Sequence, residues 1–388
     1  AVDQVALGII DRMGADLVHI NRQTQRTEPA LAKSWSVSKD GTQFTLKLRR
    51  GLQFSDGVPF NADDVLFTFQ VYLDESVHSP RRDALLIGSK PIKVEKLDNY
   101  TVRIIFPSPY APAERVLDGL TILPRHLLEE DYKAGKINQV WGLNVPPGKI
   151  AGLGAYRLKQ VVPGERIVFE RNPYFWKVDS KGQRLPYTNE LTFLIVPNQD
   201  AQVMHFQAGD AHIISGLSAE NFSALEPDQQ KGHYKLYDAG PSLEYNFLMF
   251  NLNDDTEGRL PDLARKQKWF RDVRFRQAIS SAVDRRAIVR LVYQGRGAAL
   301  ASHVSPGNKQ WFNPRVPLTE QSVAKAKRLL QSAGFSWKPD GTLVDRGGQA
   351  VEFTMVVSSS NSQRIQMATL VQQDLKQVGI NAHIAPLE

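Results

Sequence analysis

The chain has 388 residues, a formal net charge of +7, 42% hydrophobic and 23% charged residues, and no cysteine. This length predicts two or three domains at about 100–200 residues each. The lack of thiols excludes disulfides, thiolate metal sites and cysteine nucleophiles, and is more typical of an oxidising compartment than of the cytoplasm.

The first part of the chain reads as strands and turns around one helix. The alternation in TQFTLKL, residues 42–48, predicts a half-buried strand. Asp56-Gly57 is a turn signal, and a helix is predicted to begin after Asn61, whose side chain is a good N-cap. A further strand is predicted at 99–106, where three prolines follow.

A hairpin is predicted next, with strands at Tyr156–Val161 and Arg166–Glu170 and a turn at Pro163-Gly164. Another strand follows at Glu190–Pro197, and then a short helix that Gly209 ends. Glu244–Asn253 is an apolar run with little alternation, so we expect a strand that is covered on both faces or crosses between domains.

The pattern then changes to α/β. A helix is predicted from about Asp272 to Tyr293, and a second one is capped by Thr319 and ended by Gly334. The last elements are a strand at Val351–Val357, a helix closed by Gly379, and a parallel partner strand at Ile380–Ile384, which together form a βαβ unit.

The positive charge is concentrated between Arg259 and Arg296, where eleven basic residues face three acidic ones. Such a cluster can bind nucleic acid. However, Phe275, Ala278, Ile279 and Ala282 recur at helical spacing here, and no aromatic residues alternate with the basic ones. We therefore interpret the cluster as the solvated face of an amphipathic helix and expect no nucleic-acid partner.

A search for catalytic and metal-binding motifs gives little. The sequence has no zinc motif, nucleophile elbow, Walker A motif or dinucleotide fingerprint, and its histidines show no tight spacing. The Ser-x-x-Lys pairs at Ser36 and Ser322 lack companion motifs. Adjacent acids point apart, so Asp63-Asp64, Glu129-Glu130 and Asp254-Asp255 are interpreted as caps or surface residues. We predict no catalytic residue, no metal site and no cofactor, which favours a binding protein over an enzyme on an α/β scaffold.

Five segments in a fixed order carry a resemblance to a known family. They are PALAKSWSVSKDGTQFTLKLRRGLQFSDGVPFNADDVLFTF, GLGAYRLKQVVPGERIVFERNPYFW, FQAGDAHII, FRDVRFRQAISSAVDRRAIVRLVYQGRG and AKRLLQSAGF. Together they resemble the family 5 extracellular solute-binding proteins, the peptide, dipeptide and nickel receptors of ABC importers. The departures are an extra residue between Tyr174 and Trp176, and Ala208 and His212 in the third segment.

The resemblance implies a fold and a function. The fold would be α/β, a two-lobed periplasmic-binding-protein-like structure of type II. Residues 1–150 would form an extra subdomain of the first lobe, 151–243 its main sheet, and 244–388 the beginning of an incomplete second lobe. The function would be an extracytoplasmic receptor, periplasmic or anchored through a segment outside this chain. It would capture an oligopeptide or dipeptide between its lobes and deliver it to an ABC permease.

The resemblance also suggests where a ligand is contacted. Tyr245, Asn246 and Phe247 on the predicted crossing strand are the candidate binding residues, and the alternative is that they only pack the hinge. We expect a monomer. Receptors for nickel, an oligosaccharide or another small solute remain alternatives on the same fold.

Overall fold

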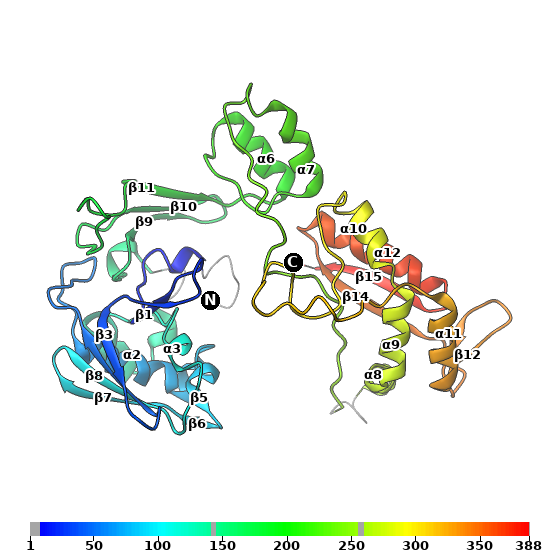
Figure 1. Ribbon diagram of the computed structural model, residues 1–388, viewed down its shortest axis with the longest axis horizontal. Helices are drawn as coiled ribbons and strands as arrows, with labels where there is room; N and C mark the ends of the chain where they lie inside the picture. Colours follow the sequence, from blue (N-terminus) through cyan, green and yellow to red (C-terminus); the bar gives the residue numbers. More distant parts are fainter. Residues whose placement is uncertain (1–7, 141–144, 255–259, 388) are drawn as a thin grey trace. The chain divides into compact units, whose positions relative to one another are not determined.

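The computed structural model describes residues 8–140, 145–254 and 260–387 (Figure 1). The chain divides into two compact units, Ala1–Ile195 and Val196–Glu388. No helix in the described ranges combines the length and apolar character needed to cross a membrane.

Unit 1 is built on a four-stranded antiparallel sheet in the order β3-β4-β8-β7. Alternation buries Phe44, Leu46 and Leu48 of β4, as predicted, and these side chains join a core with Val65 and Phe69 of helix α2. The strands and helices of this region are β1 (Val18–Ile20), β2 (Thr27–Pro29), β3 (Ala32–Val37), β4 (Gln43–Leu48), α2 (Ala62–Leu73), β5 (Leu86–Ile87), β6 (Lys90–Pro91), β7 (Lys93–Asp98), β8 (Thr101–Ile105), α3 (Ala113–Val116), α4 (Arg125–Lys133) and α5 (Ile137–Val140).

A second sheet of unit 1 has the order β11-β10-β9, with strands β9 (Tyr156–Val162), β10 (Arg166–Arg171) and β11 (Glu190–Leu194). The predicted hairpin is confirmed, since β9 and β10 pair in antiparallel register. Gly164 in the connecting turn has φ +72°, a conformation that glycine adopts without the strain of a Cβ atom.

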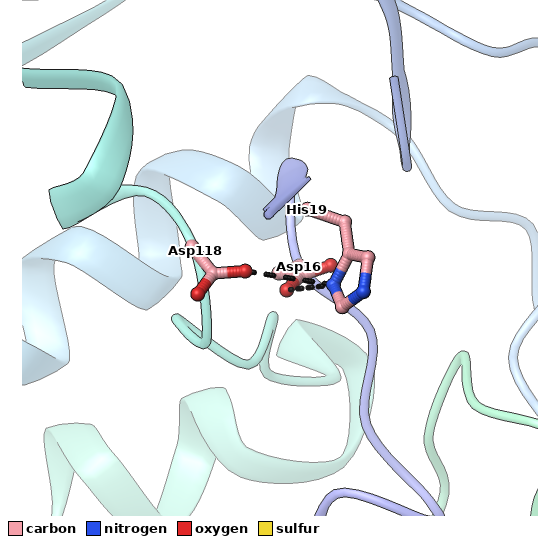
Figure 2. Close-up of side chains that lie close together, drawn as sticks. All are labelled: Asp16, His19 and Asp118. Atoms are coloured by element: carbon pink, nitrogen blue, oxygen red, sulfur yellow. Dashed lines mark ion pairs between the residues drawn. The ribbon is translucent and has the colours of Figure 1, made fainter. Parts of the chain in front are cut away.

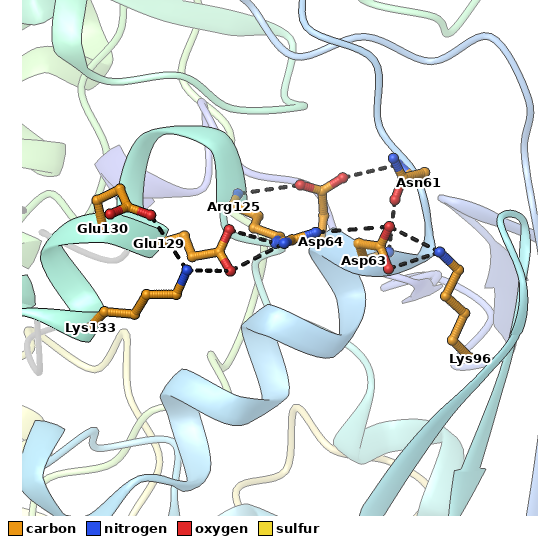
Figure 3. Close-up of polar contacts among 8 residues, drawn as sticks. All are labelled: Asn61, Asp63, Asp64, Lys96, Arg125, Glu129, Glu130 and Lys133. Carbon is orange, nitrogen blue, oxygen red and sulfur yellow. Dashed lines mark hydrogen bonds and ion pairs between the residues drawn. The ribbon is translucent and has the colours of Figure 1, made fainter.

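The predicted helix start at Asn61 is confirmed as a capping box (Figure 3). Asn61 Oδ1 accepts a hydrogen bond from the Asp63 backbone N–H at 2.7 Å, and Asp64 Oδ2 accepts one from the Asn61 N–H at 2.9 Å. Asp63 also binds Lys96 Nζ at 2.9 Å, and Asp64 Oδ1 accepts from the Arg125 backbone N–H at 3.2 Å. Both acids of this pair therefore have structural roles.

Two other sequence candidates also have structural roles. Glu129 and Glu130 pair with Lys133 Nζ at 3.3 and 3.4 Å (Figure 3). Ser322 Oγ accepts a hydrogen bond from the Lys325 backbone N–H at 3.2 Å, so the serine of this Ser-x-x-Lys pair is the N-cap of a helix.

Unit 2 contains a parallel pair of strands, β14 and β15, joined by helix α12, which confirms the predicted βαβ unit (Figure 1). Phe275, fully buried, belongs to a core that α12, α11 and β14 also supply. The elements are α6 (Gln199–Ala208), α7 (Ala219–Leu225), α8 (Pro261–Arg271), α9 (Val273–Ala282), α10 (Arg285–Leu291), α11 (Val323–Ser332), β12 (Ser336–Trp337), β13 (Leu343–Val344), β14 (Glu352–Ser358), α12 (Ser362–Lys376) and β15 (Asn381–Leu387).

The prediction of one helix from Asp272 to Tyr293 is wrong, because α9 and α10 are separate helices. Val283 is extended, with ψ 124°, and the Asp284 side chain accepts a hydrogen bond from the Ala287 N–H at 2.8 Å. An aspartate that binds the backbone ahead of it starts a new helix rather than continuing an old one.

Thr319 was also the wrong cap for the next helix, since Ser322 has that role. Both are good capping residues, and their side chains differ only by a methyl group, so the choice between them depended on where the chain turns into the helix.

The predicted strand at Glu244–Asn253 is absent. These residues form no ladder with any described strand, and Phe247 and Met249 are 66% and 80% exposed. A strand needs a partner for its backbone N–H and C=O groups, and no described segment pairs with this one. Of the acid pair that follows, Asp255 lies outside the described residues, as does Arg259 at the start of the basic cluster.

Candidate functional site

The predicted binding residues lie on a segment without regular secondary structure, and Asn246 contacts a residue just after α10 and a residue of α12. Asn246 Nδ2 donates a hydrogen bond to Tyr293 Oη at 2.9 Å, and Arg364 Nε donates one to Asn246 Oδ1 at 3.2 Å. Tyr293 follows α10 by two residues, and Arg364 lies in the first turn of α12. The Asn246 amide thus uses both its donor and its acceptor between these two partners.

The start of α12 explains where Arg364 lies. Asn361 caps this helix, and its side chain accepts a hydrogen bond from the Arg364 backbone N–H at 2.9 Å. The first turn of a helix carries a partial positive charge, which attracts anions rather than a guanidinium group. No carboxylate of the described residues forms an ion pair with Arg364, whose exposed side chain donates a hydrogen bond to the neutral amide of Asn246.

Tyr293 is the most buried member of the group. Burial raises the pKa of its hydroxyl above the ordinary tyrosine value, while the hydrogen bond from Asn246 and the positive charge of Arg364 act in the opposite direction. Its hydroxyl also lies 3.6 Å from Met367 Sδ. The neutral hydroxyl therefore serves as a fixed hydrogen-bonding group at physiological pH.

Aromatic rings flank the amide on the same segment. The ring centroids of Tyr245 and Phe247 are 5.5 Å apart, and Tyr245 makes an edge contact with His303 at 5.9 Å. The Tyr245 hydroxyl lies 3.4 Å from His303 Nδ1. Tyr245, Asn246 and Phe247 are the three residues that the sequence singled out; Asn246 and Phe247 are exposed, and Tyr245 is half-buried.

The sequence did not single out Tyr293, His303 or Arg364. Tyr293 ends a recognised helix pattern, and Arg364 is one of many arginines, so neither has a local signal. Only their contacts with Tyr245 and Asn246 identify them. The group as a whole offers aromatic surface, an amide, a phenol and a guanidinium group, which suit binding by stacking, hydrogen bonds and charge.

A hollow of about 1240 Å³ lies in unit 2 with Tyr293 in its wall. This volume is above the roughly 300–1,000 Å³ of most small-molecule sites. Arg296 lines it as well, but Glu226 and Phe222 occupy that guanidinium through an ion pair at 2.9 Å and a ring contact at 4.4 Å. His212, which departs from the family pattern, also lines the hollow.

The comparisons with known proteins agree on one family. A model of the bacterial extracellular solute-binding proteins, family 5 Middle, matches residues 26–388. A probable ABC transporter-binding protein of Deinococcus radiodurans is 30% identical over 381 residues, which are 96% of this chain and 63% of that protein. The chain therefore spans less than two thirds of that relative's length.

Two solved structures show the fold. The oligopeptide-binding protein AppA from Bacillus subtilis, in complex with a nonapeptide, has a TM-score of 0.77 and 25% identity, over 100% of this chain and 71% of that one. The periplasmic binding protein MelB from Agrobacterium fabrum, in complex with stachyose, has a TM-score of 0.81 and 27% identity, over 98% of this chain and 60% of that one. The α/β fold expected from the sequence is thus that of the periplasmic binding proteins.

Proposed function

The chain belongs to family 5 of the bacterial extracellular solute-binding proteins, and from this membership we propose that it is part of a receptor for an ABC importer. The receptor captures a solute between two lobes and delivers it to the permease. The first lobe comprises an extra subdomain, residues 1–150, and a main sheet, residues 151–243, and the second lobe begins at 244. The receptor is extracytoplasmic and monomeric, and it binds its ligand without chemical conversion.

The proposed ligand is an oligopeptide or dipeptide, contacted by Tyr245, Asn246 and Phe247. The observation that carries this choice is the contact between Asn246 and the guanidinium of Arg364, which has no carboxylate partner in the described ranges. A peptide has a terminal carboxylate that a guanidinium binds with two parallel hydrogen bonds. Its backbone amides match the donor and acceptor of Asn246, and its side chains match the rings of Tyr245 and Phe247.

A neutral oligosaccharide is the second candidate, because the stachyose-bound relative has the same fold. Aromatic rings also pack against sugar rings, so Tyr245 and Phe247 suit either ligand. A neutral sugar does not need the charge of Arg364, however, and this difference separates the two candidates.

The test is the thermal stability of the full-length protein with a panel of di- to nonapeptides, neutral oligosaccharides and Ni²⁺. A ligand raises the melting temperature in proportion to the logarithm of its concentration over Kd. We expect peptides to stabilise the protein and Arg364→Gln to weaken their affinity roughly tenfold, or about 1.4 kcal/mol. Arg328→Gln, an exposed arginine of α11, is the matched control and leaves affinity unchanged.

A response to oligosaccharides alone would favour the second candidate. A response to Ni²⁺ alone would contradict the peptide proposal. Equal peptide affinity in Arg364→Gln and Arg328→Gln would be consistent with a peptide receptor but would show that Arg364 does not contact the peptide.

A further inference from the structure

Three side chains that can bind a metal ion meet beside β1 in unit 1. Figure 2 shows the His19 imidazole next to the carboxylates of Asp16 and Asp118. His19 Nδ1 lies 3.6 Å from Asp16 Oδ2 and 3.5 Å from Asp118 Oδ1. Within the described ranges, no other histidines, aspartates or glutamates gather in such a group of three.

The backbone holds this arrangement in place. The neighbours of His19 in β1 are buried, so alternation directs its side chain to the opposite, more exposed side. The Gly119 N–H donates to Asp16 Oδ2 at 3.0 Å, and the Ile20 N–H donates to Asp118 Oδ1 at 2.8 Å. Each carboxylate is therefore fixed by the segment that carries the other one.

The distances fit a shared ion better than direct hydrogen bonds. Both exceed the 2.7–3.2 Å typical of an N–H···O hydrogen bond. Ligands about 2.0–2.2 Å from a tetrahedral zinc ion lie roughly 3.4 Å from one another, close to the separations seen here. We propose that Asp16, His19 and Asp118 form a Zn²⁺ site, with water as the fourth ligand.

The ligand types favour zinc over the common hard cations. Imidazole nitrogen is a good zinc ligand, whereas Ca²⁺ and Mg²⁺ prefer six or more oxygen ligands. Two carboxylates balance the charge of the dication, and their side chains are only 17% and 10% exposed. A bound cation would offset the cost of burying these two carboxylates.

The guanidinium of Arg22 competes with a metal ion for one of the carboxylates. Arg22 Nη2 lies 3.3 Å from Asp118 Oδ2, the oxygen that is not directed at His19. The Arg22 side chain is 72% exposed, so it can move away without loss of packing. Asp118 Oδ1 remains for the zinc ion.

The proposed role of the ion is structural. It would join the N-terminal strand to a turn about one hundred residues later, and a ligand that binds only the folded state stabilises that state. The site is made entirely by unit 1, so it does not depend on the solute proposed above.

The test is zinc binding and thermal stability of the chelator-treated protein, measured during titration with ZnCl₂ and, in parallel, CaCl₂ and MgCl₂. We expect one zinc ion per chain and a melting temperature that rises with zinc. His19→Gln and Asp118→Asn should each weaken zinc binding by at least roughly tenfold. Asp118→Asn keeps an oxygen acceptor for the Ile20 N–H, and His19 is 41% exposed, so both variants should fold.

The matched control is His126→Gln, which removes a histidine paired with one aspartate instead of two. It should bind zinc like the unaltered protein. The proposal is overturned if the unaltered protein binds no stoichiometric zinc, if Ca²⁺ or Mg²⁺ binds equally well, or if His19→Gln and His126→Gln retain the same zinc affinity. Zinc bound elsewhere, for instance by the solute site, would give this last result.

Discussion

His126 Nε2 lies 2.7 Å from Asp56 Oδ2, although the two residues are seventy positions apart. This contact joins the Asp56-Gly57 turn to the first turn of α4. The His126 ring also meets Phe54, one of the largest fully buried side chains, at 5.2 Å between centroids. The turn that marks the family signature therefore belongs to the packing of unit 1.

Asp56→Asn should leave ligand affinity nearly unchanged, because the Asp56 side chain contacts His126 and its own turn. The partly exposed pair of Asp56 and His126 contributes at most about 1 kcal/mol to the free energy of unfolding. The measurement is ligand titration alongside thermal melting. A large loss of affinity with an unaltered melting temperature would contradict a purely structural role for this aspartate.

Gly57→Val should destabilise the protein by about 1–3 kcal/mol. Gly57 has φ +90°, which a β-branched residue rarely adopts, and a Cβ atom there would lie 3.2 Å from Tyr174 Oη. Urea denaturation measures the loss. Gly148→Val is the control, because that exposed glycine has no positive φ and no neighbour near an added Cβ. Similar losses in both variants would show that the turn geometry is not the cause.

Phe275→Ala should reduce the free energy of unfolding by about 3–5 kcal/mol, since this fully buried ring lies in the core of unit 2. It contacts Phe270 and Phe335, whose ring centroids are 6.0 and 5.3 Å away. Val273→Ala on the same helix is the control, because Val273 is 53% exposed and should change stability by less than about 0.5 kcal/mol. Chemical denaturation of both variants decides the comparison.

Asp272→Asn should weaken the fold at neutral pH but not in acid. Arg274 binds both carboxylate oxygens, with Nη2 at 2.7 Å from Oδ2, and this contact lowers the pKa of Asp272 in the folded state. A lowered pKa gives stability that is present above the unfolded value, about 3.9, and is lost as the pH falls through the folded value. Asparagine keeps the helix cap, so the substitution removes mainly the charge.

The measurement for Asp272 is denaturation from pH 3 to 8, with Arg274→Gln and the double variant completing a mutant cycle. We expect a difference of up to about 1 kcal/mol at pH 7 that shrinks below pH 4. A difference that is independent of pH would mean that the ion pair is not its source.

The sequence predicted many of the elements correctly, because their signals are local. Alternation in β4, the cap at Asn61 and the glycines after α6 and α12 each act within a few residues of the chain. Apolar periodicity likewise predicted the buried face of α9, including Phe275 and Ile279.

The errors occurred where a local signal was ambiguous. The run at Glu244–Asn253 has the composition of a strand, but a ladder also requires a partner elsewhere in the chain. Asp284 fits a helix interior or a helix start, and its contact with Ala287 made it a start. The missing ladder partner could not be predicted without knowing which segments meet, whereas Asp284 left open a choice between two local conformations.

The sequence by itself therefore determined the order of most elements, the family, and the segment proposed to contact a solute. Only the tertiary structure decided that Arg364 meets Asn246 and that His19 lies between Asp16 and Asp118. The physical reason is how far apart the interacting residues lie in the sequence. Periodicity and caps are set by residues three or four apart, whereas these contacts join positions about one hundred residues apart that only packing brings together.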